Sequence, residues 1–163
     1  MQYAHGGDIY TYKNLLDFSI NVNPLGPADA VVEAAARSLQ RIGEYPDSRS
    51  RELRNALAEK KGLAAERFVI GNGAADLLFS LVLAEKPQKA MIVIPAFSEY
   101  EQALKTVGCE ILYHEVKKEN NFRLGTDLTE KITSELDFLF LCSPSNPAGQ
   151  AVEKEFLIKI AEK

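Results

Sequence analysis

Asn146 lies in the segment SPSNP (residues 143–147), which directly follows an apolar run from Phe138 to Cys142. Two prolines exclude helix and central strand for this segment, and Pro147 disfavours the helical conformation for the residue before it. An asparagine held in this way donates a hydrogen bond to a ligand oxygen with little loss of conformational entropy. The pattern favours Asn146 as a binding residue, with a capping role as the alternative.

The glycine turn GNGA (residues 71–74) precedes a stretch with helical periodicity. Gly71 and Gly73 permit a tight turn, and the backbone amides of Ala74 and Ala75 would then begin a helix without partners inside it. Such a helix N-terminus attracts anions. The G-x-G spacing is not that of a dinucleotide-binding loop, and no P-loop lysine follows, so both of these sites are disfavoured. A plain structural turn is the alternative to an anion site.

The segment IPAFSEY (residues 94–100) places Phe97 and Tyr100 at the start of another predicted helix. An aromatic ring at this position can lie flat against a planar ligand ring. Tyr100 also falls on the apolar face of its helix, with Ala103 and Leu104, so packing in the core is the alternative.

Strands and helices alternate along the second part of the chain and must position these segments. The strands at 90–94 and 138–142 are apolar without alternation, as expected when helices cover both faces of a sheet. This order predicts an α/β fold with a mainly parallel sheet. The expected strands are 67–70, 90–94, 110–116 and 137–142, and the expected helices are 28–42, 50–61, 75–86, 100–107, 126–134 and 153–162.

Ligands of such sheets bind beyond the carboxyl ends of the strands. The segments GNGA, IPAFSEY and SPSNP each follow a predicted strand. We therefore expect all three at one edge of the sheet, where they would form a single site.

The composition indicates a globular domain with one core: 163 residues, 46% apolar, 26% charged, with a formal charge of −4. No basic stripe is present, which disfavours nucleic acid as a partner. Cys109 and Cys142 are interpreted as buried thiols in a reducing compartment, and His114, in mid-strand, is assigned to structure. No apolar stretch approaches the roughly 20 residues of a membrane span and no signal peptide is recognisable. We expect a cytoplasmic protein without a metal site or membrane contact.

Taken in this order, the segments resemble the N-terminal part of a fold-type I pyridoxal-phosphate enzyme of the class I/II aminotransferase superfamily. The resemblance runs from His5 to at least Gln150 and points to the branch that holds histidinol-phosphate aminotransferase and threonine-phosphate decarboxylase. It implies part of a three-layer α/β/α large domain and pyridoxal 5'-phosphate as the cofactor. The implied domains are an arm at 1–27, N-terminal helices at 28–62, and the first part of the cofactor-binding domain at 63–163.

The resemblance also assigns residues to the cofactor. The glycine turn would hold its phosphate through the backbone of Gly73, Ala74 and Ala75. Tyr100 would stack on the pyridine ring, and Asn146 would contact the phenolic oxygen of the ring.

Further residues are assigned to the substrate and to a partner subunit. Tyr45, in a Y-P-D segment, would reach the phosphate of the neighbouring subunit's cofactor, which implies a homodimer. The segment AHGGDIY resembles threonine-phosphate decarboxylase more than the aminotransferase, and in that enzyme the arm helps to bind the substrate phosphate. This implicates His5 and Asn21, although a structural or disordered role is the alternative for His5.

The leading hypothesis is therefore a lyase of cobalamin biosynthesis, threonine-phosphate decarboxylase, which acts on a small phosphorylated amino acid. The nearest alternative is histidinol-phosphate aminotransferase, a transferase with the same cofactor. A non-catalytic module that binds a phosphorylated metabolite, or an unrelated α/β phosphate-binding domain, is the alternative from another class.

Catalysis in this family requires a lysine that forms the Schiff base and an aspartate paired with the pyridinium nitrogen. In the family both residues lie downstream of the N-P-x-G segment, and Lys154, Lys159 and Lys163 stand at the wrong place for this role. We therefore expect the sequence to be a fragment that contains no catalytic residue and is inactive on its own.

Overall fold

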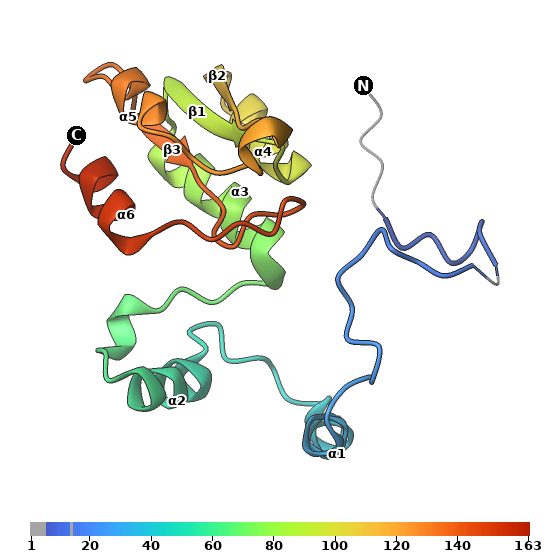
Figure 1. Ribbon diagram of the computed structural model, residues 1–163. Coiled ribbons are helices and arrows are strands. Elements are labelled where there is room, and N and C mark those ends of the chain that lie inside the picture. Colours follow the sequence, from blue (N-terminus) through green and yellow to red (C-terminus); the bar gives the residue numbers. More distant parts are fainter. Residues whose placement is uncertain (1–5, 14) are drawn as a thin grey trace.

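The computed structural model describes residues 6–13 and 15–163 (Figure 1), so the predicted substrate residue His5 lies outside the described residues. The helices are α1 (Asp29–Ser38), α2 (Arg51–Lys61), α3 (Gly73–Glu85), α4 (Ser98–Thr106), α5 (Asp127–Lys131) and α6 (Lys154–Ala161). The strands are β1 (Lys89–Ile94), β2 (Glu110–Glu115) and β3 (Phe138–Phe140). Three short 3₁₀ helices complete the described residues: η1 (Leu39–Arg41), η2 (Ala65–Arg67) and η3 (Lys118–Asn120).

The sheet of the described residues has the order β2-β1-β3, and both strand pairs are parallel. Ile92 of β1 pairs with Tyr113 of β2 and with Phe140 of β3, so β1 is the central strand. Its sequence, KAMIVI, is apolar without alternation because both of its faces are covered. The predicted α/β fold with a parallel sheet is therefore confirmed.

One face of the sheet packs against α3 and α4. Ala90 and Ile92 point to this face and meet Val82 of α3 and Leu104 of α4, with Phe140 of β3 completing the cluster. Each of these side chains is at most 6% exposed. Burial of a Val, Leu, Ile or Phe side chain contributes about 1.5–3 kcal/mol, so this cluster is the main source of stability.

The other face of the sheet carries Val93 and its partner in the register, His114. His114 is 1% exposed. Its Nδ1 lies 3.3 Å from Lys131 Nζ and its Nε2 lies 3.7 Å from Asp127 Oδ2, and both partners belong to α5. Burial and then the Lys131 charge lower the pKa of His114, while Asp127 opposes them. His114 thus attaches β2 to α5, in agreement with its structural assignment.

The strand expected at 67–70 is not formed. Phe68 is extended, with φ −108° and ψ 126°, but it and the following residues pair with no strand of the described chain. Val69 is 76% exposed. A strand requires a neighbour for its backbone groups, and the described residues supply none here. The helix expected at 126–134 is also shorter, because Ile132 is already extended.

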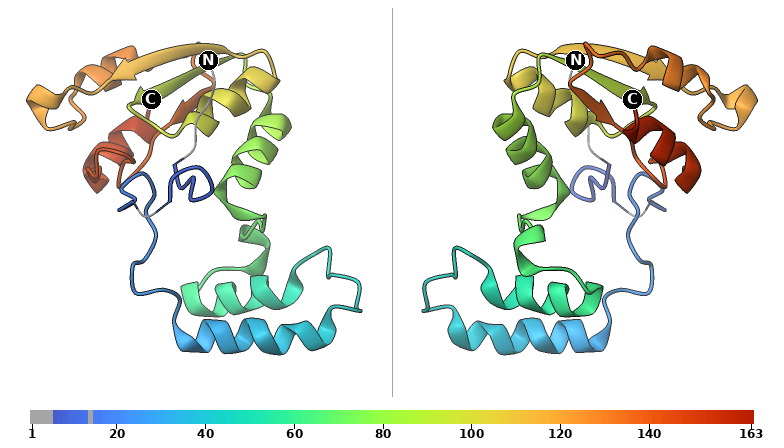
Figure 2. Two further views of the ribbon diagram at one scale, coloured as in Figure 1. Left: turned by 90° about the vertical axis from the view of Figure 1, so that its right-hand side faces the viewer. Right: turned by 90° about the vertical axis from the view of Figure 1, so that its left-hand side faces the viewer.

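The helices expected at 28–42 and 50–61 form, but they contribute nothing to the core. Neither α1 nor α2 contains a buried residue. Val31 is 60% exposed, Ile42 is 81% exposed and Phe18 is 92% exposed. Figures 1 and 2 show the reason, because α1 and α2 lie apart from the sheet and its helices. No helix of the described residues is long and apolar enough to cross a membrane.

Candidate functional site

The carboxyl ends of the three parallel strands lie at one edge of the sheet. Helix α3 leads directly into the start of β1 and packs against α4 on one face, so its N-terminus lies toward this same edge (Figure 1). The edge thus carries the glycine turn, the start of α4 after β1, and the loop after β3. This is the arrangement that the order of elements predicted.

The glycine turn forms a tight entry to α3. Gly73 is the first residue of the helix and has φ +84°, a conformation that side chains rarely adopt. The carboxylate of Asp76 accepts a hydrogen bond from the backbone amide of Asn72 at 2.8 Å. Ala74 and Ala75 are exposed and lie in the first helical turn, where amides have no partner within the helix. These amides are available to an anion.

Tyr100 is fixed by two aromatic neighbours. Its ring is stacked on Phe140 with centroids 4.5 Å apart and an angle of 6° between the planes. Phe97 meets the ring edge-on, with centroids 6.1 Å apart. Burial, and after it the neighbouring thiol of Cys142, raises the pKa of Tyr100 to about 12. Tyr100 therefore packs against the core, as one of the two interpretations of the sequence expected, and its helix begins toward the edge of the sheet.

The loop after β3 is held by two serine hydroxyls. The backbone amide of Gln150 donates to Ser145 Oγ at 3.1 Å, and that of Val152 donates to Ser143 Oγ at 2.9 Å. The backbone of Ser145 also donates to the carbonyl oxygen of Gln150 at 2.7 Å. These bonds close the loop on itself and leave Asn146 exposed at its turn.

Sequence reasoning missed the two serines and the position of Cys142. Cys142 was expected in the core, yet it is only half-buried, its Sγ lies 3.2 Å from the carbonyl oxygen of Pro144, and it adjoins Tyr100. The signal that could have identified Ser143 and Ser145 is their placement beside the prolines, where short hydroxyl side chains commonly bond to the backbone.

The remaining predicted residues do not lie with this group. Tyr45 is 95% exposed on the segment between α1 and α2, away from the sheet (Figure 2). That segment is ordered by Asp47, whose carboxylate accepts the backbone amides of Arg49 and Arg51. Asn21 is exposed on the arm. The topology thus places the segments of Gly73, Ala74, Ala75, Tyr100 and Asn146 toward one edge of the sheet, whereas Tyr45 and Asn21 are exposed on segments outside it.

The groups at this edge are suited to binding a ligand. The start of α3 offers free amides and the positive end of a helix, Tyr100 offers a fixed aromatic ring, and Asn146 offers an amide on a closed loop. A ligand with a phosphate, a planar ring and a polar ring substituent would use all three.

Comparison with known proteins identifies the family of the chain. The family model described as aminotransferase class I and II matches residues 13–163. The chain is 38% identical to the threonine-phosphate decarboxylase of Salmonella typhimurium, over 98% of this chain and 46% of that protein. It is 35% identical to the histidinol-phosphate aminotransferase of Methanococcoides burtonii, over 91% of this chain and 42% of that protein.

The solved structures agree. The histidinol-phosphate aminotransferase of Clostridium acetobutylicum superposes with a TM-score of 0.79 and 26% identity, over 91% of this chain and 43% of that one. The chain spans less than half the length of the relatives it matches. Since the family model covers nearly the whole chain, the chain belongs to the aminotransferase class I and II family.

Proposed function

We propose that the whole protein is a pyridoxal-phosphate enzyme that acts on a small phosphorylated amino acid, with decarboxylation of threonine phosphate as its reaction. The observation that carries this proposal is the topology: the α3 N-terminus, the start of α4 that bears Tyr100 and the loop that bears Asn146 all lie toward the carboxyl ends of the parallel strands. The 38% identity to a threonine-phosphate decarboxylase over 98% of the chain supports the choice of reaction.

The residues at the edge fit the cofactor part by part. Its phosphate is an anion and suits the free amides of Ala74 and Ala75 at the positive end of α3. Its pyridine ring suits Tyr100, whose own ring is already fixed by Phe140. Its phenolic oxygen accepts a hydrogen bond and suits the exposed amide of Asn146.

When bound, pyridoxal 5'-phosphate withdraws electrons from the α-carbon of an amino acid and so allows one of its bonds to break. In our proposal the described residues contribute binding and orientation. The α3 amides anchor the phosphate, Tyr100 fixes the plane of the ring, and Asn146 fixes its rotation within that plane. A ring held in this way would give the substrate a fixed reference plane, and the groups that bind the substrate would determine which bond of its α-carbon stands perpendicular to that plane.

Two segments outside the edge complete the proposal. The N-terminal arm, with His5 and Asn21, would contact the substrate phosphate. Tyr45 would contact the cofactor phosphate of a second subunit in a homodimer, and its 95% exposure leaves the hydroxyl accessible to a partner. Both assignments require subunit contacts or arm positions beyond those of the described chain.

The reaction can be tested with protein expressed from the complete reading frame and loaded with pyridoxal phosphate. The proposal predicts that threonine phosphate releases CO₂ without any added keto acid. It also predicts loss of activity on substitution His5→Ala or Asn21→Ala, expressed mainly as a higher KM, because these residues are assigned to binding. Absence of CO₂ release from a protein that retains the cofactor would contradict it.

Histidinol-phosphate aminotransferase is the second candidate, because a relative with that name is 35% identical over 91% of the chain. It uses the same cofactor and differs in the bond broken at the α-carbon. The same protein, supplied with histidinol phosphate and a keto acid, would then form a new amino acid without release of CO₂. The two assays run side by side distinguish the candidates.

A further inference from the structure

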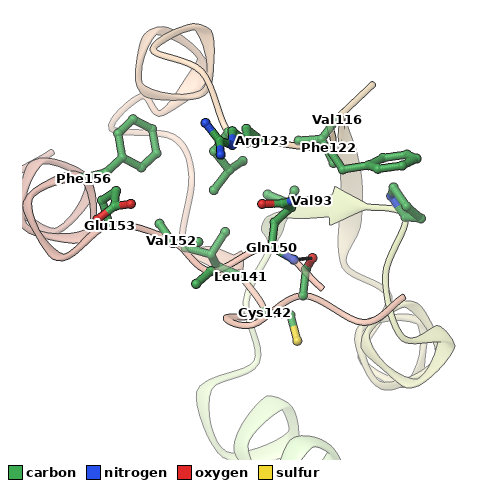
Figure 3. Close-up of a pocket in the computed structure, with 14 residues that line it drawn as sticks. Val93, Val116, Phe122, Arg123, Leu141, Cys142, Gln150, Val152, Glu153 and Phe156 are labelled. Atoms are coloured by element: carbon green, nitrogen blue, oxygen red, sulfur yellow. Dashed lines mark hydrogen bonds between the residues drawn. The ribbon is translucent and has the colours of Figure 1, made fainter. Parts of the chain in front are cut away.

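A pocket of about 370 Å³ lies beside the loop that carries Asn146 (Figure 3). Val93 lies in its wall, whereas the neighbouring Ile92 points to the α3 and α4 cluster. Its volume falls within the range of roughly 300–1,000 Å³ typical of small-molecule sites. The apolar part of the wall includes Val93, Val116, Leu124, Leu141, Val152 and Phe156.

Three polar side chains line this pocket together with the apolar ones. Figure 3 shows the guanidinium of Arg123, the carboxylate of Glu153 and the amide of Gln150 around the same space. Glu153 is the N-cap residue of α6 and makes no side-chain bond to that helix. Among the described residues, neither Arg123 nor Glu153 takes part in an ion pair. Both residues are exposed, so one positive and one negative group border the pocket at its opening to solvent, without an ion-pair partner among the described residues.

The backbone that carries Arg123 is unusual. Asn121 and Phe122 have φ of +51° and +56°, in the left-handed region. Asparagine tolerates this conformation, but a bulky residue such as Phe122 rarely adopts it. The turn is held by hydrogen bonds from Phe122 N to Lys117 O at 2.9 Å and from Arg123 N to Asn120 O at 3.0 Å. Its effect is to place both Phe122 and Arg123 in the pocket lining, and strained backbone of this kind clusters at binding sites.

We propose that this pocket binds a free α-amino acid with an apolar side chain. The carboxylate of the ligand would pair with Arg123, whose planar guanidinium matches a carboxylate. Its ammonium group would pair with Glu153, and its side chain would lie against Phe156 and the strand residues. An amino acid is the small molecule whose two opposite charges and apolar body match this lining.

This site is separate from the proposed cofactor site. Tyr100 packs toward the α3 and α4 face, and the pocket lies on the other face, with Cys142 at the boundary because it lines the pocket and adjoins Tyr100. The two are connected through the loop after β3, because Ser145 and Gln150 line the pocket and also close the loop that bears Asn146. An amino acid in the pocket would therefore contact the anchors of Asn146 and stabilise the closed loop.

The test uses the 163-residue chain without cofactor, so that the proposed catalytic function plays no part in the result. L-Phenylalanine and L-leucine are titrated against ¹⁵N-labelled protein. We expect saturable shifts of the backbone amide signals of Gln150 and Val152. Absence of saturable binding by both amino acids, with the fold intact by circular dichroism, would overturn the proposal.

Variants and analogues identify the charges involved. Arg123→Met and Glu153→Gln should each weaken L-phenylalanine binding at least tenfold. The matched controls Lys118→Met and Glu155→Gln change neighbouring charges outside the pocket and should leave the affinity unchanged. 3-Phenylpropionate, which lacks the ammonium group, should bind at least tenfold more weakly than phenylalanine, and this difference should disappear in Glu153→Gln. Equal binding of the two ligands by the unmodified chain would contradict the proposal.

Discussion

Tyr100 combines two roles that sequence patterns treat as alternatives. One face of its ring is stacked on Phe140, which makes it part of the core, and its hydroxyl lies beside Cys142 at the site. The two interpretations did not compete because a ring has two faces and an edge, and the core uses only some of them. A ring that the core holds at one face is well suited to fix the plane of a ligand that contacts its other face.

The ionisation of Tyr100 gives a direct check on its surroundings. Burial and Cys142 raise its pKa to about 12, whereas tyrosine in an unfolded chain ionises near pH 10. The folded state therefore keeps the proton longer, and stability falls as the pH rises from about 10 to 12. We expect a late step in the absorbance titration of the tyrosines that Tyr100→Phe removes and that Tyr10→Phe retains. Identical curves for the two variants would show that Tyr100 is not held in this environment.

The place of Asn146 outside any helix or strand was predictable from the sequence, because proline restricts the backbone of the residue before it. The hydrogen bonds that hold its loop were not predictable. The hydroxyls of Ser143 and Ser145 accept from backbone amides five to nine positions away, which depends on how the loop closes. The location of Cys142 likewise depends on where β3 ends. The apolar run continues to Cys142, but the strand ends at Phe140.

At the scale of elements, parallel strands and the helices between them follow from the apolar runs and their spacing. The strands β1 and β2 and the helices α2, α3, α4 and α6 were expected from the sequence at nearly their observed bounds, whereas β3 has three residues where six were expected. The strand expected at 67–70 has the same apolar character but lacks a neighbour in the described residues, and pairing is not encoded in a local pattern. Composition thus predicted which segments are extended, but not whether each would be paired.

The closed loop after β3 should depend on its serines. Ser143→Ala and Ser145→Ala each remove one hydrogen bond, worth about 1 kcal/mol, which corresponds to a factor of roughly five in local opening. Amide hydrogen exchange should therefore accelerate by about that factor at Val152 in the first variant and at Gln150 in the second. Ser80→Ala, on the exposed surface of α3, is the control. Exchange unchanged in all three variants would argue against the anchoring role.

The start of β3 should respond to pH through Asp137. Its carboxylate accepts the backbone amides of Gln88 at 2.8 Å and Lys89 at 3.0 Å, and these bonds, that of Lys89 first, lower its pKa. A depressed pKa stabilises the fold above pH 4 and ceases to do so as the pH falls through the folded value. The urea midpoint of the unmodified chain should exceed that of Asp137→Asn at pH 7, and the difference should vanish in acid. A difference independent of pH would contradict this role.

The whole molecule has two unlike parts. The residues from α3 onward form a sheet with a buried cluster, while α1, α2 and the arm bury no large apolar side chain within the described residues. Phe18, Leu25 and Tyr45 are each more than 90% exposed. Apolar surface of this extent is typical of interfaces with other segments or subunits. The sequence predicted these helices from their periodicity but not their lack of a packing partner.

This contrast predicts different responses to substitution. Leu104 is fully buried between α4 and the sheet, so Leu104→Ala should cost about 2–5 kcal/mol of unfolding free energy. Leu25→Ala, at a residue that is 92% exposed, should cost almost nothing in the isolated chain. Urea denaturation of both variants provides the measurement. A large loss for Leu25→Ala would mean that the arm packs against the sheet in solution.

The measurement that tests the cofactor site most directly is binding of pyridoxamine 5'-phosphate to the 163-residue chain, followed by ³¹P NMR. This form of the cofactor carries an amine in place of the aldehyde, so it does not react with surface lysines. We predict saturable binding that Tyr100→Leu and Asn146→Ala each weaken about tenfold, while Asn23→Ala, on the arm, leaves it unchanged. Binding that is equal in all three variants, or absent from the folded chain, would contradict the assignment of this edge to the cofactor.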